Sequence, residues 1–322
     1  MQRSNILQLE VDDDTNLFGF RHIRMGLTER LGAQSMGASV YSAERGLPTG
    51  PFHYHYGVEE WVYVISGAPV LRDHGGPRPL RPGDMVCFPV GPSGAHTFSG
   101  PGTFVVFSTG THREPWMSVY PDSGKVGGPE GILLASSEVA YWYGEGTWDP
   151  SSDAAPEPRA ARETPRRPII NLGTRTASEP PLQGAPPGYA ARRTRLGPDL
   201  GSEMLGATLY ELDPGEGTAP YHYHSGREEW LLVQSGTPTL RHPDGEDALE
   251  AGDVVCFVDG PAGAHRVLNR GSEPARIVLL STVQLPVSAH YPGSGKVLFR
   301  DADGEAHIFR DADRVGYWDG EA

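Results

Sequence analysis

The sequence His-Tyr-His-Tyr-Gly-Val-Glu-Glu-Trp at residues 53–61 returns as His-Tyr-His-Ser-Gly-Arg-Glu-Glu-Trp at residues 222–230. The pairing extends without a gap over residues 19–96 and 188–265, where nearly half of the paired residues are identical. Self-similarity at one fixed offset over such a length indicates a duplicated structural unit. We therefore expect two related domains, and a chain of 322 residues is long enough for both.

The two copies are separated by a segment of different composition. Residues 150–168 are rich in Pro, Ala, Ser, Glu and Arg and carry no apolar periodicity, which is typical of a linker. The sequence thus predicts an N-terminal domain at residues 1–149 and a C-terminal domain at residues 169–322.

Glycine and proline are frequent throughout the chain, with 42 and 30 occurrences. They disfavour long helices and favour short strands joined by many turns. Runs such as residues 61–65 and 84–88 are short, rich in β-branched or aromatic residues, and bounded by Gly or Pro. Because no 12-residue window carries an apolar stripe of helical period, we predict an all-β protein with a sandwich or barrel in each half.

Charge and composition exclude several function classes. The formal net charge of −14 argues against a nucleic-acid backbone or an anionic membrane as partner. Cys87 and Cys256 lie in the middle of predicted strands between apolar neighbours, so we expect buried free thiols rather than a disulfide. The first residues lack the apolar region of a signal peptide, and no apolar run is long enough to span a bilayer, which predicts a cytoplasmic protein.

The repeated stretch brings polar side chains to one face of a strand. His53 and His55 are two residues apart, so both imidazoles point to the same side. Unbroken alternation would add Glu59 to that side, but Gly57 permits a bulge that resets the parity. The apolar pattern of the strand that follows then favours Glu60 on the inner face.

The second copy repeats this arrangement, and each copy adds a third histidine after its next strand. His222, His224 and Glu229 form the inner set of the C-terminal half, with Glu228 on the outer face. His96 and His265 are the later histidines, each delivered by a turn that contains Gly and Pro. Trp61 and Trp230 are expected to pack on the outward face, between sheets or between the two halves.

Three imidazoles and one carboxylate are costly to bury unless they bind something. A divalent transition metal satisfies them, one ion in each domain, and an octahedral ion held by four protein ligands keeps two positions open. We favour Fe²⁺ or Mn²⁺ and keep Zn²⁺, Ni²⁺ and Cu²⁺ as alternatives, since imidazole and carboxylate suit all five metals.

Residues 53–67 and 83–96 resemble the two sequence motifs of the cupin superfamily, and residues 222–236 and 252–265 repeat them. The resemblance covers nearly the whole chain, so the protein looks like a bicupin. It implies a jelly-roll β-barrel in each half and one metal ion per barrel. The ligands that it implies are His53, His55, Glu60, His96, His222, His224, Glu229 and His265. The closing segments of both halves resemble bacterial single-domain cupins that lack an assigned reaction.

Three functions remain open at this point. The first is an oxidoreductase of dioxygenase type acting on a small organic molecule, with substrate and dioxygen at the open metal positions. The second is an oxygen-independent isomerase, lyase or decarboxylase that uses the metal as a Lewis acid. The third is a non-catalytic module that binds a metal or a small molecule. Arg24 and Arg193 occupy equivalent positions and could clamp a substrate carboxylate or form salt bridges, and a homodimer is expected from the family resemblance.

Overall fold

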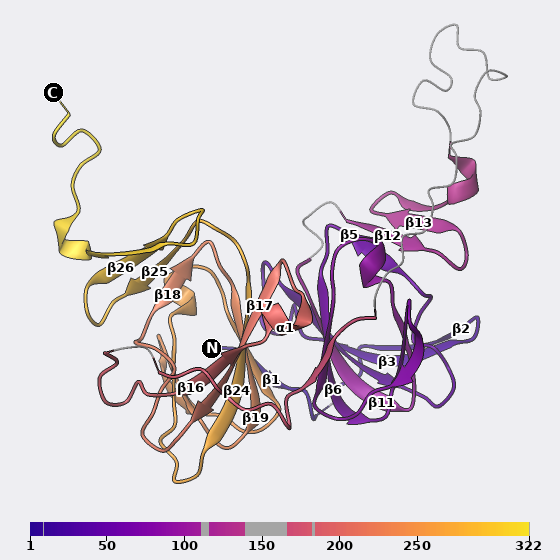
Figure 1. Ribbon diagram of the computed structural model, residues 1–322, viewed down its shortest axis with the longest axis horizontal. Coiled ribbons are helices and arrows are strands. Elements are labelled where there is room, and N and C mark those ends of the chain that lie inside the picture. The colour runs from indigo at the N-terminus through magenta and orange to yellow at the C-terminus, as the bar shows by residue number, and fades with distance from the viewer. Residues whose placement is uncertain (9, 111–115, 139–165, 182–183, 322) are drawn as a thin grey trace, which may run out of the picture.

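The computed structural model describes residues 1–8, 10–110, 116–138, 166–181 and 184–321. Two β-rich halves lie side by side, in indigo-to-magenta and in orange-to-yellow (Figure 1). Residues 150–165 of the predicted linker lie outside the described part of the chain. Among the described residues, none of the helices has the length and apolar character that crossing a bilayer requires.

The N-terminal half is built from antiparallel strands in three sheets. The described strands are ordered β15-β9-β6-β11-β4-β3-β2, β10-β7-β8 and β14-β13-β12-β5. Their bounds are β2 (Asp13–Leu17), β3 (Phe20–Gly26), β4 (Gly37–Ala43), β5 (Tyr54–Tyr56), β6 (Glu60–Gly67), β7 (Val70–Asp73), β8 (Gly76–Pro79), β9 (Asp84–Phe88), β10 (Thr97–Ser99), β11 (Gly102–Ser108), β12 (Met117–Tyr120), β13 (Lys125–Gly128), β14 (Gly131–Leu134) and β15 (Ile169–Asn171). Short 3-10 turns span η1 (Pro92–Gly94) and η2 (Ala135–Ser137).

The C-terminal half repeats this plan. Its described strands are ordered β1-β22-β19-β24-β17-β16, β21-β20-β23 and β18-β25-β26-β27. Their bounds are β1 (Arg3–Asn5), β16 (Arg192–Arg195), β17 (Leu205–Leu212), β18 (Tyr223–Ser225), β19 (Glu229–Ser235), β20 (Thr239–His242), β21 (Gly245–Ala248), β22 (Asp253–Phe257), β23 (Arg266–Leu268), β24 (Ala275–Thr282), β25 (Val287–Tyr291), β26 (Lys296–Arg300) and β27 (Ala306–Arg310), with the short helix α1 (Gly197–Leu200) and the 3-10 turns η4 (Pro261–Gly263) and η5 (Asp311–Asp313). The predicted all-β jelly-roll architecture with internal duplication is confirmed.

The two large sheets exchange edge strands. β1, at the start of the chain, pairs with β22 of the C-terminal half, with Arg3 opposite Val255. β15, which follows the predicted linker, pairs with β9 of the N-terminal half, with Ile169 opposite Val86. Each half thus borrows one edge strand from the sequence flanking the other, which ties the halves together. The domain limits at residues 149 and 169 stay a prediction.

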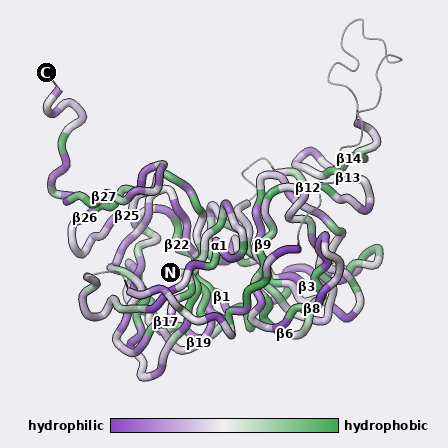
Figure 2. Tube along the Cα trace, in the orientation of Figure 1, coloured by the Kyte–Doolittle hydropathy of each residue, from purple (hydrophilic) through white to green (hydrophobic). Residues whose placement is uncertain are grey.

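The largest apolar cluster lies between the halves and not inside either of them. It combines residues from β6 and β9 with residues from β19 and β22, and Trp61 and Trp230 are fully buried in it. Figure 2 shows apolar segments where the two halves meet. Cys87 and Cys256 belong to the same cluster as free thiols, and their burial raises the pKa of both. Separate clusters fill the interior of each half.

The buried carboxylate of Glu59, in the N-terminal half, accepts hydrogen bonds from the C-terminal half. Glu59 is 0% exposed. Its Oε2 accepts hydrogen bonds from the backbone N–H groups of Glu203 at 2.7 Å and Met204 at 3.2 Å. Its Oε1 accepts from the N–H of Leu205 at 2.9 Å and from the indole Nε1–H of Trp61 at 3.0 Å. Glu59 therefore caps the loop that leads into β17 of the other half.

In the C-terminal half, Glu228 makes the equivalent hydrogen bonds to the N-terminal half. Glu228 Oε2 accepts hydrogen bonds from the backbone N–H groups of Gln34 at 2.6 Å and Ser35 at 3.1 Å. Its Oε1 accepts from the N–H of Met36 at 2.9 Å and from the indole of Trp230 at 3.0 Å. Charge-assisted hydrogen bonds of this kind offset the desolvation of a carboxylate and fix its geometry. The outward orientation of both glutamates matches the prediction.

We predict that Glu59→Gln and Glu228→Gln each lower the free energy of unfolding by roughly 3 kcal/mol, because an amide N–H₂ would face donors and the buried charge would be lost. Urea unfolding followed by tryptophan fluorescence measures this, since Trp61 and Trp230 adjoin the two carboxylates. Glu130→Gln, at an exposed position, is the matched control. Equal unfolding midpoints for all three variants would contradict the role assigned to the buried pair.

Candidate metal centres

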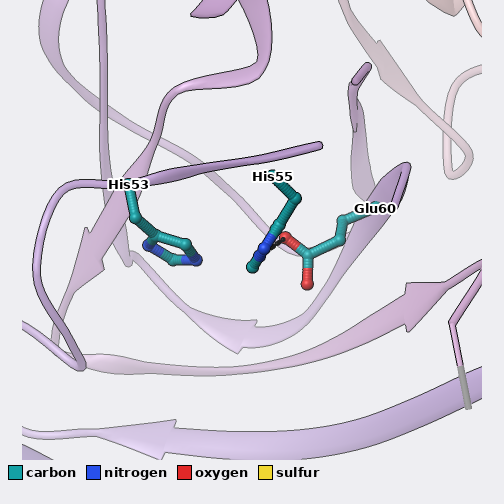
Figure 3. A group of neighbouring side chains, drawn as sticks. All are labelled: His53, His55 and Glu60. Atoms are coloured by element: carbon teal, nitrogen blue, oxygen red, sulfur yellow. Dashed lines mark ion pairs between the residues drawn. The ribbon is translucent and has the colours of Figure 1, made fainter. Parts of the chain in front are cut away.

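Four side chains from separate elements of the N-terminal half converge on one point. His55 lies in β5 and Glu60 begins β6, while His53 precedes β5 and His96 follows η1. In Figure 3 the rings of His53 and His55 point toward the Glu60 carboxylate. The nitrogen or oxygen atoms that His53, His55 and Glu60 can offer to a metal all lie within 4.8 Å of one another.

The fourth side chain completes this group. His96 Nε2 lies 3.5 Å from Glu60 Oε2, and His55 Nε2 lies 3.3 Å from the same oxygen. The ring centroid of His53 is 4.9 Å from that of His96. All four side chains that sequence reasoning assigned to this half are therefore brought together.

Backbone conformation explains why Glu60, not Glu59, faces inward. Gly57 has a φ of +83° and Gly226 one of +85°, a region that residues with a Cβ rarely adopt. This break between β5 and β6 resets the alternation of side chains. Backbone hydrogen bonds between His53 and His96, at 3.1 and 2.8 Å, then hold the two flanking segments together.

Hydrogen bonds at the Nδ1 atoms of His53 and His96 fix the orientation of both rings and leave their Nε2 atoms facing the centre. His53 Nδ1 lies 2.9 Å from the carbonyl of Pro51, and His96 Nδ1 lies 2.8 Å from that of Gly94. A carbonyl can only accept, so Nδ1 carries the proton and Nε2 presents its lone pair to the centre. This is the outer-shell arrangement that orients histidine toward a metal.

The C-terminal half reproduces the arrangement. His224 Nε2 is 3.1 Å and His265 Nε2 is 3.5 Å from Glu229 Oε2. His222 completes the group, with its ring centroid 4.7 Å from that of His265. The Nδ1 atoms of His222 and His265 again lie 2.9 Å from backbone carbonyls, here of residues 220 and 263.

One outer-shell contact distinguishes the two centres. His55 Nδ1 lies 2.9 Å from the hydroxyl of Ser118. In the C-terminal half Ala289 pairs with His224 as Ser118 pairs with His55. The Nδ1 of His224 is consequently buried with no hydrogen-bond partner in the structure.

Burial and mutual charge set the protonation states. Burial lowers the pKa of His96 and of His265 to about 3, so both imidazoles are neutral at physiological pH. Burial would raise the pKa of Glu60, yet the neighbouring histidines, His55 foremost, hold it at about 2. The pKa of Glu229 is lowered in the same way by His224. Each centre therefore presents one carboxylate anion among mostly neutral imidazoles.

The donor set fits a divalent cation. Among the described residues, Glu60 Oε2, Glu229 Oε2 and His265 Nε2 are buried and make no contact of hydrogen-bond geometry. The two carboxylate oxygens face histidine Nε2 atoms at 3.1 to 3.5 Å. Buried polar atoms without partners are rare in native proteins, and each requires an explanation. A metal ion bound by imidazole and carboxylate would satisfy them, because those ligands suit transition metals. Each half thus carries a His/Glu group that could hold a divalent metal.

Cavities adjoin the N-terminal centre. One of about 170 Å³ is bordered by His53, Glu60 and His96. A larger one of about 540 Å³ shares Glu60 and Tyr41 with it and extends to residues such as Arg24 and Ser39. A small organic molecule could therefore reach this centre.

Sequence reasoning missed two residues of this surrounding. His22 and Tyr41 border the smaller cavity, and their rings meet edge to face at 5.4 Å. His22 Nδ1 lies 2.8 Å from the carbonyl of Thr49, and its Nε2 lies 3.4 Å from Asp13. Comparison of the two copies did not single out His22, because Ala191 occupies the equivalent position in the second copy.

The two equivalent arginines have different surroundings. Arg193 Nε lies 3.6 Å from the carboxylate of Glu179, which is the salt bridge considered as one alternative. Arg24 instead borders the larger cavity, and its Nη1 donates to the hydroxyl of Ser39 at 3.2 Å.

Comparisons with known proteins agree with this fold. The cupin domain family matches residues 40–111 and, separately, residues 208–281. No curated protein matches the chain. A variant of oxalate decarboxylase from Bacillus subtilis aligns over 87% of this chain and 76% of its own, with 15% identity and a TM-score of 0.50. A sugar phosphate isomerase of the cupin superfamily from Silicibacter pomeroyi aligns over 42% of this chain and 90% of its own, with 25% identity and a TM-score of 0.38.

The likeness to the decarboxylase concerns the fold alone, because identity is low. It nevertheless extends across both halves, as the duplicated family match does. The chain therefore belongs to the cupin superfamily, as a two-domain bicupin.

Proposed function

We propose that the protein is a metal-dependent enzyme that acts on a small organic molecule, with one divalent ion in each half. The single observation that carries this is the pair of His/Glu groups whose buried Glu60 Oε2 and Glu229 Oε2 atoms make no contact of hydrogen-bond geometry among the described residues. The proposed ligands are His53, His55, Glu60 and His96 in one half and His222, His224, Glu229 and His265 in the other. The expected homodimer and the cytoplasmic location stay predictions.

Fe²⁺ or Mn²⁺ is the metal that we propose. Carboxylate oxygen favours the harder cations and imidazole the intermediate ones, so a mixed set suits these two metals. The absence of a thiolate from the ligand set supports the same choice, since Cys87 and Cys256 lie in the cluster between the halves.

In the N-terminal half, side chains that line the two cavities would bind and orient the substrate. A bound divalent metal supplies Lewis-acid chemistry or, as iron, electron transfer to dioxygen. Phe98, Phe104 and Val106 line the smaller cavity and give it an apolar wall beside the proposed ligands. Arg24, which lines the larger cavity, keeps guanidinium N–H groups beyond its bond to Ser39 and can orient a polar substrate group.

Our first candidate reaction is an oxidation of dioxygenase type. The four-residue ligand set leaves two positions of an octahedral ion for other groups, enough for a substrate and a co-substrate. The apolar wall formed by Phe98, Phe104 and Val106 would shield reactive species from water on that side.

The second candidate is an oxygen-independent isomerisation, elimination or decarboxylation. The observation that favours it is the placement of His22 and Tyr41 beside the cavity that Glu60 and His96 border. Both are able to move a proton, and neither belongs to the proposed ligand set. The oxalate decarboxylase that shares the bicupin fold is an example of a decarboxylase on this scaffold.

The ligand assignment predicts metal content. We expect two ions per chain after loading with Mn²⁺ or Fe²⁺, one in His96→Ala, one in His265→Ala, and none in the double variant. Elemental analysis of the desalted proteins measures this, and His74→Ala, at an exposed histidine, is the control. Two ions in the double variant would contradict the assignment.

The outer-shell difference predicts unequal affinities. Ser118→Ala should weaken metal binding in the N-terminal half about tenfold, because His55 loses its orienting contact. Ala289→Ser should strengthen binding in the other half by providing that contact to His224. Competition with a chelator, in variants that retain one centre, measures both affinities. The prediction is wrong if the two substitutions leave the affinities unchanged.

Substrate screening under air and under nitrogen separates the candidate reactions. Substrate-dependent oxygen uptake by the iron-loaded protein supports the first, and equal turnover without oxygen supports the second. His22→Ala should then lower kcat at least tenfold in the second case, as expected for a general acid or base. Binding without turnover under either atmosphere would contradict an enzymatic function and leave a non-catalytic binding module.

A further inference from the structure

Arg24, in β3 of the N-terminal half, is a half-buried arginine without a counter-ion. Its guanidinium makes one hydrogen bond among the described residues, from Nη1 to the hydroxyl of Ser39 at 3.2 Å. None of the described carboxylates forms an ion pair with it. A guanidinium carries five N–H donors in a planar fork, so most of the donors of Arg24 are available to a ligand.

The acidic residue opposite Arg24 is engaged by other side chains. Asp13 of β2 lies directly across from Arg24 in the β2–β3 register, and opposite residues share one face of a sheet. The Asp13 carboxylate nevertheless lies 3.4 Å from His22 Nε2 and accepts a hydrogen bond from the hydroxyl of Thr15 at 3.0 Å. These contacts leave Arg24 unpaired.

The C-terminal half places a carboxylate of its own at the equivalent position. Arg193 corresponds to Arg24 and lies opposite Glu179, whose Oε2 is 3.6 Å from Arg193 Nε. The backbone N–H of Glu179 donates to the carbonyl of Arg193 at 2.8 Å, and its Oε1 accepts from the N–H of Arg195 at 2.9 Å. An arginine at this position of the fold therefore pairs with a carboxylate in one half and lacks one in the other.

A cavity joins Arg24 to the N-terminal centre. The cavity of about 540 Å³ is lined by Arg24 and by Glu60. Glu60 and Tyr41 also line the smaller cavity of about 170 Å³, which His53 and His96 border. A small organic molecule in these adjoining spaces can face the guanidinium at one end and the histidines at the other.

The other charged groups at the larger cavity have partners or face solvent. Asp12 accepts from Arg30 Nη2 at 2.5 Å and from the backbone N–H of Gly26 at 2.6 Å. Glu29 is exposed, so water screens its charge. A divalent ion would outweigh the single charge of Glu60. The charge that remains unbalanced is positive, and a carboxylate matches it in both sign and planar geometry.

We propose that Arg24 determines the specificity of the N-terminal centre by binding the carboxylate of a small organic acid, whose remainder extends toward His53, Glu60 and His96. This inference rests on the proposed function and deepens it by naming the substrate class. The C-terminal centre does not share the subsite, because Glu179 already engages Arg193.

Isothermal titration calorimetry of the Mn²⁺-loaded chain tests this, with malonate, uncharged malonamide and inorganic phosphate as probes. We expect one malonate site per chain, with an affinity that falls about tenfold or more in Arg24→Gln. Arg24→Lys should give an intermediate affinity, because it keeps the charge and loses the planar fork. Malonamide and phosphate should bind at least tenfold more weakly than malonate. Arg193→Gln is the matched control and should leave the affinity within twofold.

Three results would refute the subsite. They are equal malonate affinities in the wild type and Arg24→Gln, malonamide or phosphate binding as tight as malonate binding, and no malonate binding by the wild type. Thermal unfolding verifies that the variants fold, and Arg24→Met replaces Arg24→Gln if the latter does not.

Metal content of the same samples separates this inference from the proposed function. Malonate binding that depends on Arg24 in a chain that takes up no metal would support the subsite and refute the proposed function. Two ions per chain, with malonate binding unchanged in Arg24→Gln, would refute the subsite and leave the proposed metal centres in place.

Discussion

Two adjacent carboxylates, at the residue before β6 and at its first residue, must face opposite ways for this structure to exist. Glu59 points out of its half and receives four hydrogen-bond donors, three of them from the other half. Glu60 points inward to the histidines. Alternation along the extended chain turns the two side chains apart, and the break at Gly57, whose φ of +83° would strain a residue with a Cβ, decides that Glu60 is the inner one. Each half therefore uses one glutamate to hold its partner and the next one for its centre.

The two halves share the same arrangement of the two glutamates and three histidines, while the residues beside these side chains differ between the halves. The two sets of imidazoles and carboxylate have nearly equal internal distances, and the strand exchange through β1 and β15 makes each sheet depend on sequence from the other half. One difference lies beside the histidines, where Ser118 pairs with His55 in one half and Ala289 pairs with His224 in the other. The two centres therefore share one arrangement of three histidines and a glutamate and differ in the hydrogen bond that one of the histidines receives.

Much of this could be predicted from sequence. Two-residue spacing, the position of a glycine and the apolar pattern of the following strand were enough to orient Glu59 and Glu60, since all three concern local backbone geometry and the face that a strand buries. The exchange of β1 and β15 could not be foreseen, because edge pairing depends on contacts between segments far apart in the chain. His22 was missed for the same reason, as only the fold brings it beside the cavity with His53 and His96.

Anomalous X-ray diffraction from crystals of the Mn²⁺-loaded chain tests the central claim most directly. The account predicts two strong peaks per chain, each within coordination distance of three imidazole nitrogens and one carboxylate oxygen. Crystals with no anomalous peak among either set of side chains, or with manganese bound only elsewhere, would contradict it.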